Sequence, residues 1–325
     1  MESINASSGP THLVDRAAIF KTVLSVYEQE SVALEYPMYV KFDGEVGVDE
    51  GGVQRDMFTA FWEEAYTHLF EGATTVVPMV HSQMDMTTYV LLGRLISHGY
   101  LATGILPDRI ALPSLLVALL GPSVKISTST LLEAFLDYVS ATERTILKRA
   151  LDNCNVSFQP EELDQIIAIL SRFGCRIMPT PSSLISIIEQ AARYEFCLKP
   201  AAALAVLHSG IPSCHKAFWN GKSPDDIVSL HCRLIATPSK VLAMFDLSSV
   251  RNPAEERVYG YLISMVGNMQ IPELKLFLRF VTGCSVCIGS KINITFNSLS
   301  GLARRPIAHT RDFNLELPTT YMNRL

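Results

Sequence analysis

The sequence lacks the features that mark secreted, membrane and nucleic-acid-binding proteins. Its first residues, MESINASSGPTHLVD, have neither a positively charged start nor an apolar run, so they do not resemble a secretory signal. Its longest apolar runs are too short to span a bilayer. Its net charge of −5 gives no basic excess that would favour nucleic acid. We therefore expect no membrane partner and no nucleic-acid partner.

Cysteine is sparse, and its number does not suit a disulfide framework. Seven cysteines are scattered over 325 residues, which predicts reduced thiols and a location in the cytoplasm or nucleus. Cys284 and Cys287 form a Cys-x-x-Cys pair, but a zinc site would need two more ligands. The sequence also contains no Gly-rich phosphate loop followed by Lys-Ser/Thr, no Gly-x-Ser-x-Gly and no His-Glu-x-x-His. We expect no cofactor and no metal.

Apolar residues are abundant, at 48% of the chain, and the mean hydropathy of +0.23 predicts a large buried core. The length allows two or three domains. Residues 1–14 read as a flexible lead-in. Most of the remainder shows helical spacing of apolar residues, with predicted helices at about 53–69, 86–98, 112–120, 128–138, 141–153, 253–266 and 272–283.

Two short stretches near the C-terminus alternate apolar and polar residues, as half-buried strands do. The stretch 292–296 (INITF) is the first, and the stretch 313–318 (FNLELP) is the second. Between them, a loop with glycine and arginine carries Ala308-His309-Thr310-Arg311 to an exposed turn. A rigid strand pair that supports a loop is a common way for a fold to present reactive groups. We therefore expect this turn to be functional.

A second informative stretch is 42–56, FDGEVGVDEGGVQRD, which is rich in glycine and acidic residues. Its glycines, including Gly51 and Gly52, allow a sharp turn from a strand into a helix at positive φ. Glu45 and Asp49 could accept charge-assisted hydrogen bonds from Arg55 or from the free amides at the helix start. A calcium loop is the alternative, but the stretch lacks the regular oxygen-donor spacing and the terminal Glu. We predict a structural turn held by Arg55.

Together these stretches resemble the HECT domain of ubiquitin ligases. The C-terminal signature of that family reads Phe-Val-Thr-Gly, Ile-Thr-Phe, Ala-His-Thr-Cys and Leu-x-Leu-Pro. This sequence has FVTG at 280–283, ITF at 294–296, AHTR at 308–311 and LELP at 315–318. The stretch 42–56 resembles the family's motif Phe-x-Gly-Glu-x-Gly-x-Asp-x-Gly-Gly-x-x-Arg and precedes the others in the correct order. The resemblance covers about residues 36–321.

The resemblance implies an α+β, bilobal fold with a mostly helical large N-terminal lobe and a small C-terminal lobe that has a short sheet. It puts the N-lobe at residues 15–236 and the C-lobe at 237–325, with a hinge at about 231–240. Relatives continue with a closing helix and tail, so the resemblance implies a truncated C-lobe.

The same resemblance implies a docking part for a ubiquitin-conjugating enzyme at about residues 150–235. Its candidate docking aromatics are Phe196, Phe218 and Trp219. Packing in the core is the preferred interpretation for each of them.

The activity that the resemblance implies is ubiquitin-protein transfer. In the family, a cysteine thiolate takes ubiquitin from a conjugating enzyme as a thioester and passes it to a lysine of a protein substrate. Arg311 stands at the position of that cysteine, and a guanidinium carries no nucleophilic lone pair. His309 and Thr310 would then only shape the loop.

We therefore expect a HECT-type transferase that is impaired at this step. The alternative is a binding module that engages a conjugating enzyme, ubiquitin or a substrate without catalysis. A rescue nucleophile at Cys284 or Cys287 also stays open.

Overall fold

The chain folds mostly into helices, with short strands between them. In this computed structural model, the structure describes residues 10–45, 51–83, 85–153, 157–246 and 252–321. The described residues form fourteen α-helices and eight β-strands, so the predicted α+β class is confirmed. The chain divides into two compact units. Unit 1 comprises Met1–Glu64, His98–Asp108 and Ser229–Leu325, and unit 2 comprises Ala65–Ser97 and Arg109–Val228.

Unit 2 is built almost entirely of helices. One antiparallel pair, β3 (Phe70–Gly72) with β4 (Val76–Pro78), is its only sheet among the described residues. Within the unit α4 packs against α9, and α5 packs against α8. Its helices are α4 (Leu112–Leu120), α5 (Thr128–Tyr138), α6 (Ala141–Asp152), α7 (Pro160–Ser171), α8 (Leu184–Arg193), α9 (Ala201–Gly210) and α10 (Ser213–Asn220), with a π-helical turn η3 (Tyr194–Leu198) between α8 and α9.

Three helices contribute residues to both units. They are α2 (Gly52–Leu69), α3 (Met86–Thr103) and α11 (Pro224–Leu234). Among the described residues, every helix is too short or too polar to span a bilayer.

The first part of unit 1 is a parallel strand pair followed by helices. β1 (Thr11–Val14) pairs with β2 (Tyr39–Phe42). Between them lie η1 (Arg16–Ala18), α1 (Ile19–Tyr27) and η2 (Glu30–Leu34). Asp15 accepts a hydrogen bond from the Ala17 amide and so caps this helical start, as its side chain favours. This pair leads the chain to the first turn of α2.

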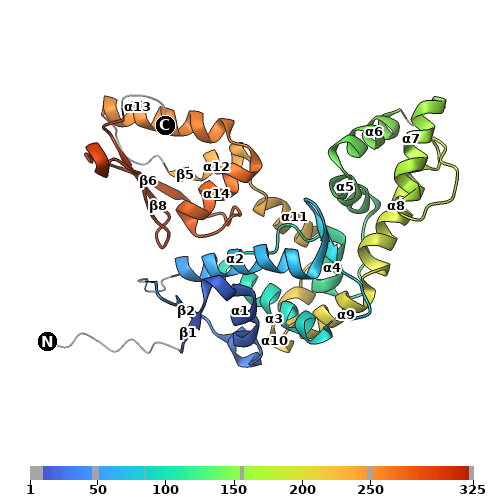
Figure 1. Ribbon diagram of the computed structural model, residues 1–325, viewed down its shortest axis with the longest axis horizontal. Coiled ribbons are helices and arrows are strands. Elements are labelled where there is room, and N and C mark those ends of the chain that lie inside the picture. The colour runs from blue at the N-terminus through green and yellow to red at the C-terminus, as the bar shows by residue number, and fades with distance from the viewer. Residues whose placement is uncertain (1–9, 46–50, 84, 154–156, 247–251, 322–325) are drawn as a thin grey trace. The chain divides into compact units, whose positions relative to one another are not determined.

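The last part of unit 1 is a four-stranded sheet packed against three helices. The sheet has the order β5-β6-β8-β7, from β5 (Phe245–Asp246), β6 (Ile292–Asn297), β8 (Asn314–Pro318) and β7 (Ile307–His309). The helices are α12 (Pro238–Met244), α13 (Pro253–Asn268) and α14 (Ile271–Thr282) (Figure 1). Their inward faces and the inward faces of β6 and β8 form one hydrophobic core. A short 3₁₀ turn, η4 (Gly301–Ala303), follows β6.

Local chemistry accounts for where these last helices begin and end. Asn252 and Glu255 form a reciprocal capping box at the start of α13, just before Pro253 in the first helical position. Gly283 ends α14 in the left-handed conformation, with φ of 81°, which a residue with a side chain rarely adopts. β6 and β8 run parallel, with Ile294 opposite Leu315, so both strands turn the same alternate residues inward.

Three sequence expectations can be compared with the fold. Residues 1–14 were expected to be a flexible lead-in, but residues 11–14 form β1, because they pair with β2. The stretch 231–240, expected as a hinge, is helical except at residues 235–237. Its role as a hinge, and the domain boundary at 236/237, stay predictions. Phe196 and Trp219, the candidate docking aromatics, are fully buried in unit 2, in agreement with the preferred core interpretation, whereas Phe218 is half-buried.

Candidate functional site at the start of α2

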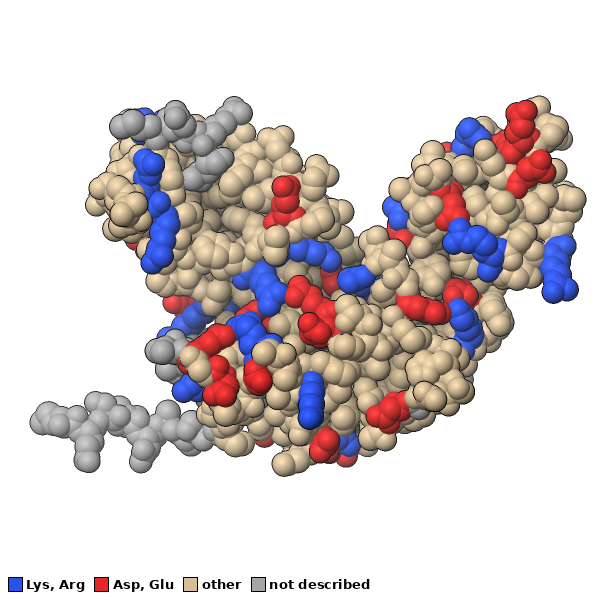
Figure 2. Space-filling model, in the orientation of Figure 1, with Lys and Arg blue, Asp and Glu red and all other residues tan. Residues whose placement is uncertain are grey.

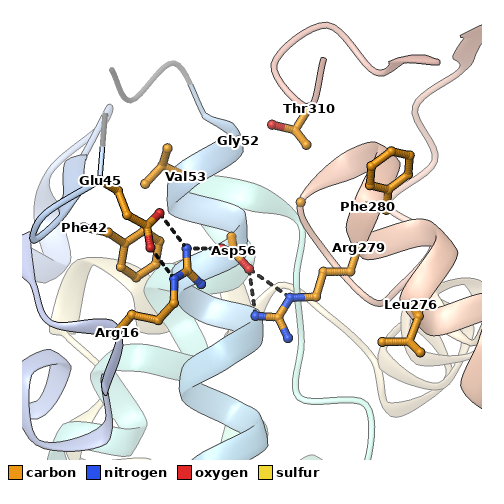
Figure 3. Close-up of a pocket in the computed structure, with 11 residues that line it drawn as sticks. Arg16, Phe42, Glu45, Gly52, Val53, Asp56, Leu276, Arg279, Phe280 and Thr310 are labelled. Atoms are coloured by element: carbon orange, nitrogen blue, oxygen red, sulfur yellow. Dashed lines mark hydrogen bonds and ion pairs between the residues drawn. The ribbon is translucent and has the colours of Figure 1, made fainter. Parts of the chain in front are cut away.

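Three segments of unit 1 that are distant in sequence meet at one place, which we call the α2 junction. They are the first turn of α2 (52–56), the last turn of α14 with Gly283 (279–283), and the turn 310–313 between β7 and β8 (Figure 3). The predicted functional turn and the predicted glycine-rich turn therefore lie next to each other.

Arg55 is the central residue of the α2 junction. Its side chain is buried, with 9% of the residue exposed. Nε donates to the carbonyl of Thr282 at 2.8 Å, and Nη2 donates to the carbonyl of Thr310 at 2.5 Å. Its guanidinium also lies over the ring of Phe313, 4.5 Å from the centroid. One arginine on α2 thus holds both the end of α14 and the turn 310–313.

Two glycines let these backbones approach each other. A Cβ at Gly52 would lie 3.1 Å from Thr310 Cβ and closer still to the Thr310 hydroxyl oxygen. A Cβ at Gly283 would lie 2.7 Å from the carbonyl oxygen of Gly52. Side chains at either position would force the segments apart.

The turn itself holds a strained residue. Phe313 has φ of 52°, in the left-handed region that costs an aromatic residue about 1–2 kcal/mol. The contact with Arg55 helps to keep this conformation, because the ring lies under the guanidinium. The strain orients the chain so that β8 begins at Asn314, directly opposite His309 on β7.

Around Arg55 lies a network of charged side chains that line a pocket of about 510 Å³ (Figure 3). Arg16 donates to Glu45 at 2.6 and 3.1 Å and lies 2.8 Å from Asp56. Asp56 also pairs with Arg279 at 2.8 Å, and Arg279 pairs with Glu63 at 2.6 Å. The hydrogen bond from Arg16 lowers the pKa of Glu45. Cations and anions alternate here, as they do across the face in Figure 2.

The three predicted catalytic residues on the turn differ in how far they are exposed to solvent. His309 and Arg311 are exposed, and Thr310 is half-buried against Gly52. His309 Nε2 lies 3.8 Å from Glu316, and Arg311 Nε lies 3.7 Å from Asp312. The turn therefore offers a guanidinium and an imidazole to solvent, and it carries no thiol or other strong nucleophile of its own.

Of the two acids that were predicted to accept from Arg55, only Glu45 is described. Glu45 bonds to Arg16, while Arg55 donates to the Thr282 carbonyl at the end of α14. Asp49 lies outside the described residues. Gly51 has φ of 95°, as predicted, and its carbonyl accepts from the amide of Arg55. Gly52 is needed for close approach to Thr310, not for positive φ.

The two thiols closest in sequence to the turn are shielded. Cys284 is fully buried and Cys287 is 6% exposed. Burial raises the pKa of both thiols, so neither is a ready nucleophile at neutral pH. Within the described ranges, no cluster of His, Cys, Asp and Glu could hold a metal ion.

Sequence reasoning missed Arg16, Asp56 and Arg279 as partners in the charged network. Asp56 and Arg279 adjoin the quoted motifs, at the position after Arg55 and the position before Phe280. No local pattern links Arg16 to them, because that contact comes from the path of β1 and η1.

Comparisons with protein-family models and with curated proteins give no match to this chain.

Proposed function

We propose that this chain is a HECT-type domain of the ubiquitin-conjugation pathway that binds a ubiquitin-conjugating enzyme and forms no thioester at its C-terminal turn. One observation carries the proposal. Arg55 belongs to the glycine-rich motif, and its two carbonyl partners belong to the FVTG and AHTR motifs. Three motifs that resemble one family thus converge on a single side chain, which chance matches would not be expected to do. The proposal includes the family's bilobal arrangement, with lobes at 15–236 and 237–325.

The chemistry of the turn favours binding without catalysis over transfer. Thioester formation needs a thiolate in contact with the incoming carbonyl carbon. Arg311 is exposed at that place, with 59% of its side chain accessible, and is permanently charged. Rescue by Cys284 or Cys287 is disfavoured, because both thiols are buried and their pKa is raised. Ubiquitin and a protein substrate remain further proposed partners.

Exposed apolar residues within 150–235 suggest where a conjugating enzyme would dock. Tyr194 and Leu198 are 53% and 61% exposed on the π-helical turn η3. The wide turn is closed by a bond from the Lys199 amide to the Tyr194 carbonyl, five residues back. Phe196 points inward, so Tyr194 and Leu198 replace it as docking candidates. Others nearby in sequence are Ile177, Met178 and Ile185.

A charging assay tests the catalytic part of the proposal. The protein is incubated with ubiquitin, activating enzyme, ATP and several conjugating enzymes, and the products are separated on non-reducing gels. We expect no reducible ubiquitin adduct on the unmodified chain and a detectable one on Arg311→Cys. Asp312→Cys is the matched control, because it puts a thiol on the same turn one residue away, and we expect less adduct there. A reducible adduct on the unmodified chain would contradict the proposal.

A binding assay tests the docking part. Conjugating enzymes are immobilised, and binding of the chain is followed by biolayer interferometry. Tyr194→Ser and Leu198→Ser should each weaken binding about tenfold or more, as loss of an interface anchor does. Ile263→Ser is the matched control, since Ile263 is an exposed apolar residue of α13 in unit 1. Equal binding by all three variants would exclude this docking surface.

A further inference from the structure

A second pocket of unit 1, separate from the α2 junction, has a volume of about 450 Å³. It is formed by the last turns of α3, the end of α11, the helix α12 and the loop 287–289. We call it the α11–α12 pocket. This volume falls within the range of small-molecule sites in proteins, which is about 300–1,000 Å³.

The walls of the α11–α12 pocket are mostly apolar. Leu234, Met244 and Cys287 are buried and line it. Two lining glycines, Gly104 and Gly289, border open space, because a Cβ at either position would meet nothing within 4 Å. The amide of Cys287 donates to the carbonyl of Leu234 at 2.9 Å, which joins the loop to the end of α11. The apolar part of a ligand could therefore pack against residues whose backbone is held in place by this bond.

The polar lining residues are cationic or phenolic. Lys240 is fixed by its ammonium, which donates to the carbonyls of Cys232 and Ile235 at the end of α11. Arg233 is exposed, and its guanidinium makes no hydrogen bond or ion pair with any residue that the structure describes. Arg233 lies close enough to Tyr100 for its charge to oppose the rise in phenol pKa that burial causes. The lining contains no Asp or Glu, and all of its residues are described.

We propose that the α11–α12 pocket binds a small amphipathic anion, with an apolar body against Met244 and Cys287 and a carboxylate or phosphate at Arg233. Two cations beside an apolar cavity without a lining acid attract an anion and give no comparable gain for a neutral molecule. The guanidinium of Arg233 can donate two parallel hydrogen bonds to a carboxylate or to a phosphate. The ligand would contact α3, α11, α12 and the loop 287–289 together, so binding stabilises unit 1. This proposal does not rest on the proposed ubiquitin pathway.

Nuclear magnetic resonance with three matched probes tests the proposal. The probes are 1-naphthyl phosphate, 1-naphthoate and neutral 1-naphthalenemethanol, which share the same apolar body. We expect both anions to shift the amide signals of Gly104 and Gly289 and to bind at least about threefold more tightly than the neutral probe, as a partly exposed charge pair allows. The ratio between phosphate and carboxylate tells which anion the site prefers.

Variants decide which residues are responsible. Arg233→Gln should abolish the preference for anions, whereas Arg176→Gln, an exposed arginine of unit 2, should leave it unchanged. Ala243→Trp places a large ring at the exposed lining position Ala243 and should remove binding of all three probes. The proposal is overturned if the neutral probe binds as tightly as the anions, if Arg233→Gln keeps the preference, or if the shifts fall away from Gly104 and Gly289.

Discussion

Replacing Arg55 by alanine should destabilise unit 1 more than any other single change at the α2 junction. Two hydrogen bonds from a charged donor to Thr282 and Thr310 contribute about 1.5–3 kcal/mol each, and the contact with Phe313 adds about 0.5–2 kcal/mol. Truncation lets water reach the freed Thr310 carbonyl, because the turn 310–313 is at the surface, but it leaves the buried Thr282 carbonyl without that donor. We therefore expect the free energy of unfolding to fall by about 2–4 kcal/mol.

Arg16→Ala is the matched control, because Arg16 also carries ion pairs at the junction but 40% of its side chain is exposed. Exposed pairs of this kind contribute about 1 kcal/mol or less. Arg55→Lys should keep less than half of the stabilisation, because an ammonium cannot donate in two fixed directions and also stack on Phe313.

Urea denaturation and hydrogen exchange measure the two consequences. Denaturation gives the loss of stability, and exchange locates it. In Arg55→Ala, amides in 304–321 should exchange faster, whereas those in α9 of unit 2 should not change. The reasoning is refuted if Arg55→Ala costs no more than Arg16→Ala and exchange in 304–321 stays as in the unmodified protein.

Three further predictions concern other residues. Gly52→Ala should lower the free energy of unfolding by about 1–3 kcal/mol, because the new Cβ clashes with Thr310. Gly260→Ala should raise it by about 0.5–1 kcal/mol, because Gly260 lies in open space on α13. Thermal denaturation measures both changes. Burial lowers the pKa of His215 in the folded protein, so as pH falls the unfolded chain binds a proton at this residue before the folded chain does. The free energy of unfolding should therefore fall as pH drops below about 6.5, and it should fall more steeply than in His215→Gln. Urea titrations at several pH values would measure this difference. Exposed Cys232 should react rapidly with a thiol reagent and buried Cys284 only after unfolding, as mass spectrometry would show.

Much of the secondary structure could be predicted, because it depends on local chemistry. The capping box of Asn252 and Glu255 and the left-handed Gly283 fixed the limits of α13 and α14 in the chain. The alternation in INITF gave β6, whose isoleucines at 292 and 294 are buried. Helix α3 extends to Thr103, further than the predicted end at residue 98, because Gly99 packs against Phe58 and does not end the helix.

Contacts between distant segments could not be predicted in the same way. Arg55 was expected to bond within its own turn, since acidic residues lie nearby in sequence. Among the described residues, its side chain donates to backbone carbonyls more than 200 residues away, at Thr282 and Thr310. A carbonyl acceptor leaves no trace in the sequence, because every residue has one. β1 was missed for a related reason: a four-residue strand is recognisable only once β2 is beside it.

At the α2 junction, the absence of a thiol at position 311 and the structure of the turn that carries this position are separate questions. Three of the contacts that hold the turn are the hydrogen bond from Arg55 to the Thr310 carbonyl, the stacking of Arg55 on Phe313 and the close approach of Gly52 to Thr310. A cysteine at the exposed position 311 leaves these three contacts in place, and under the proposed function it supplies the thiol that Arg311 lacks. This is the physical reason to expect Arg311→Cys to be tolerated, with unchanged stability, and to make the gain of a ubiquitin adduct a clean test of whether sulfur alone is missing.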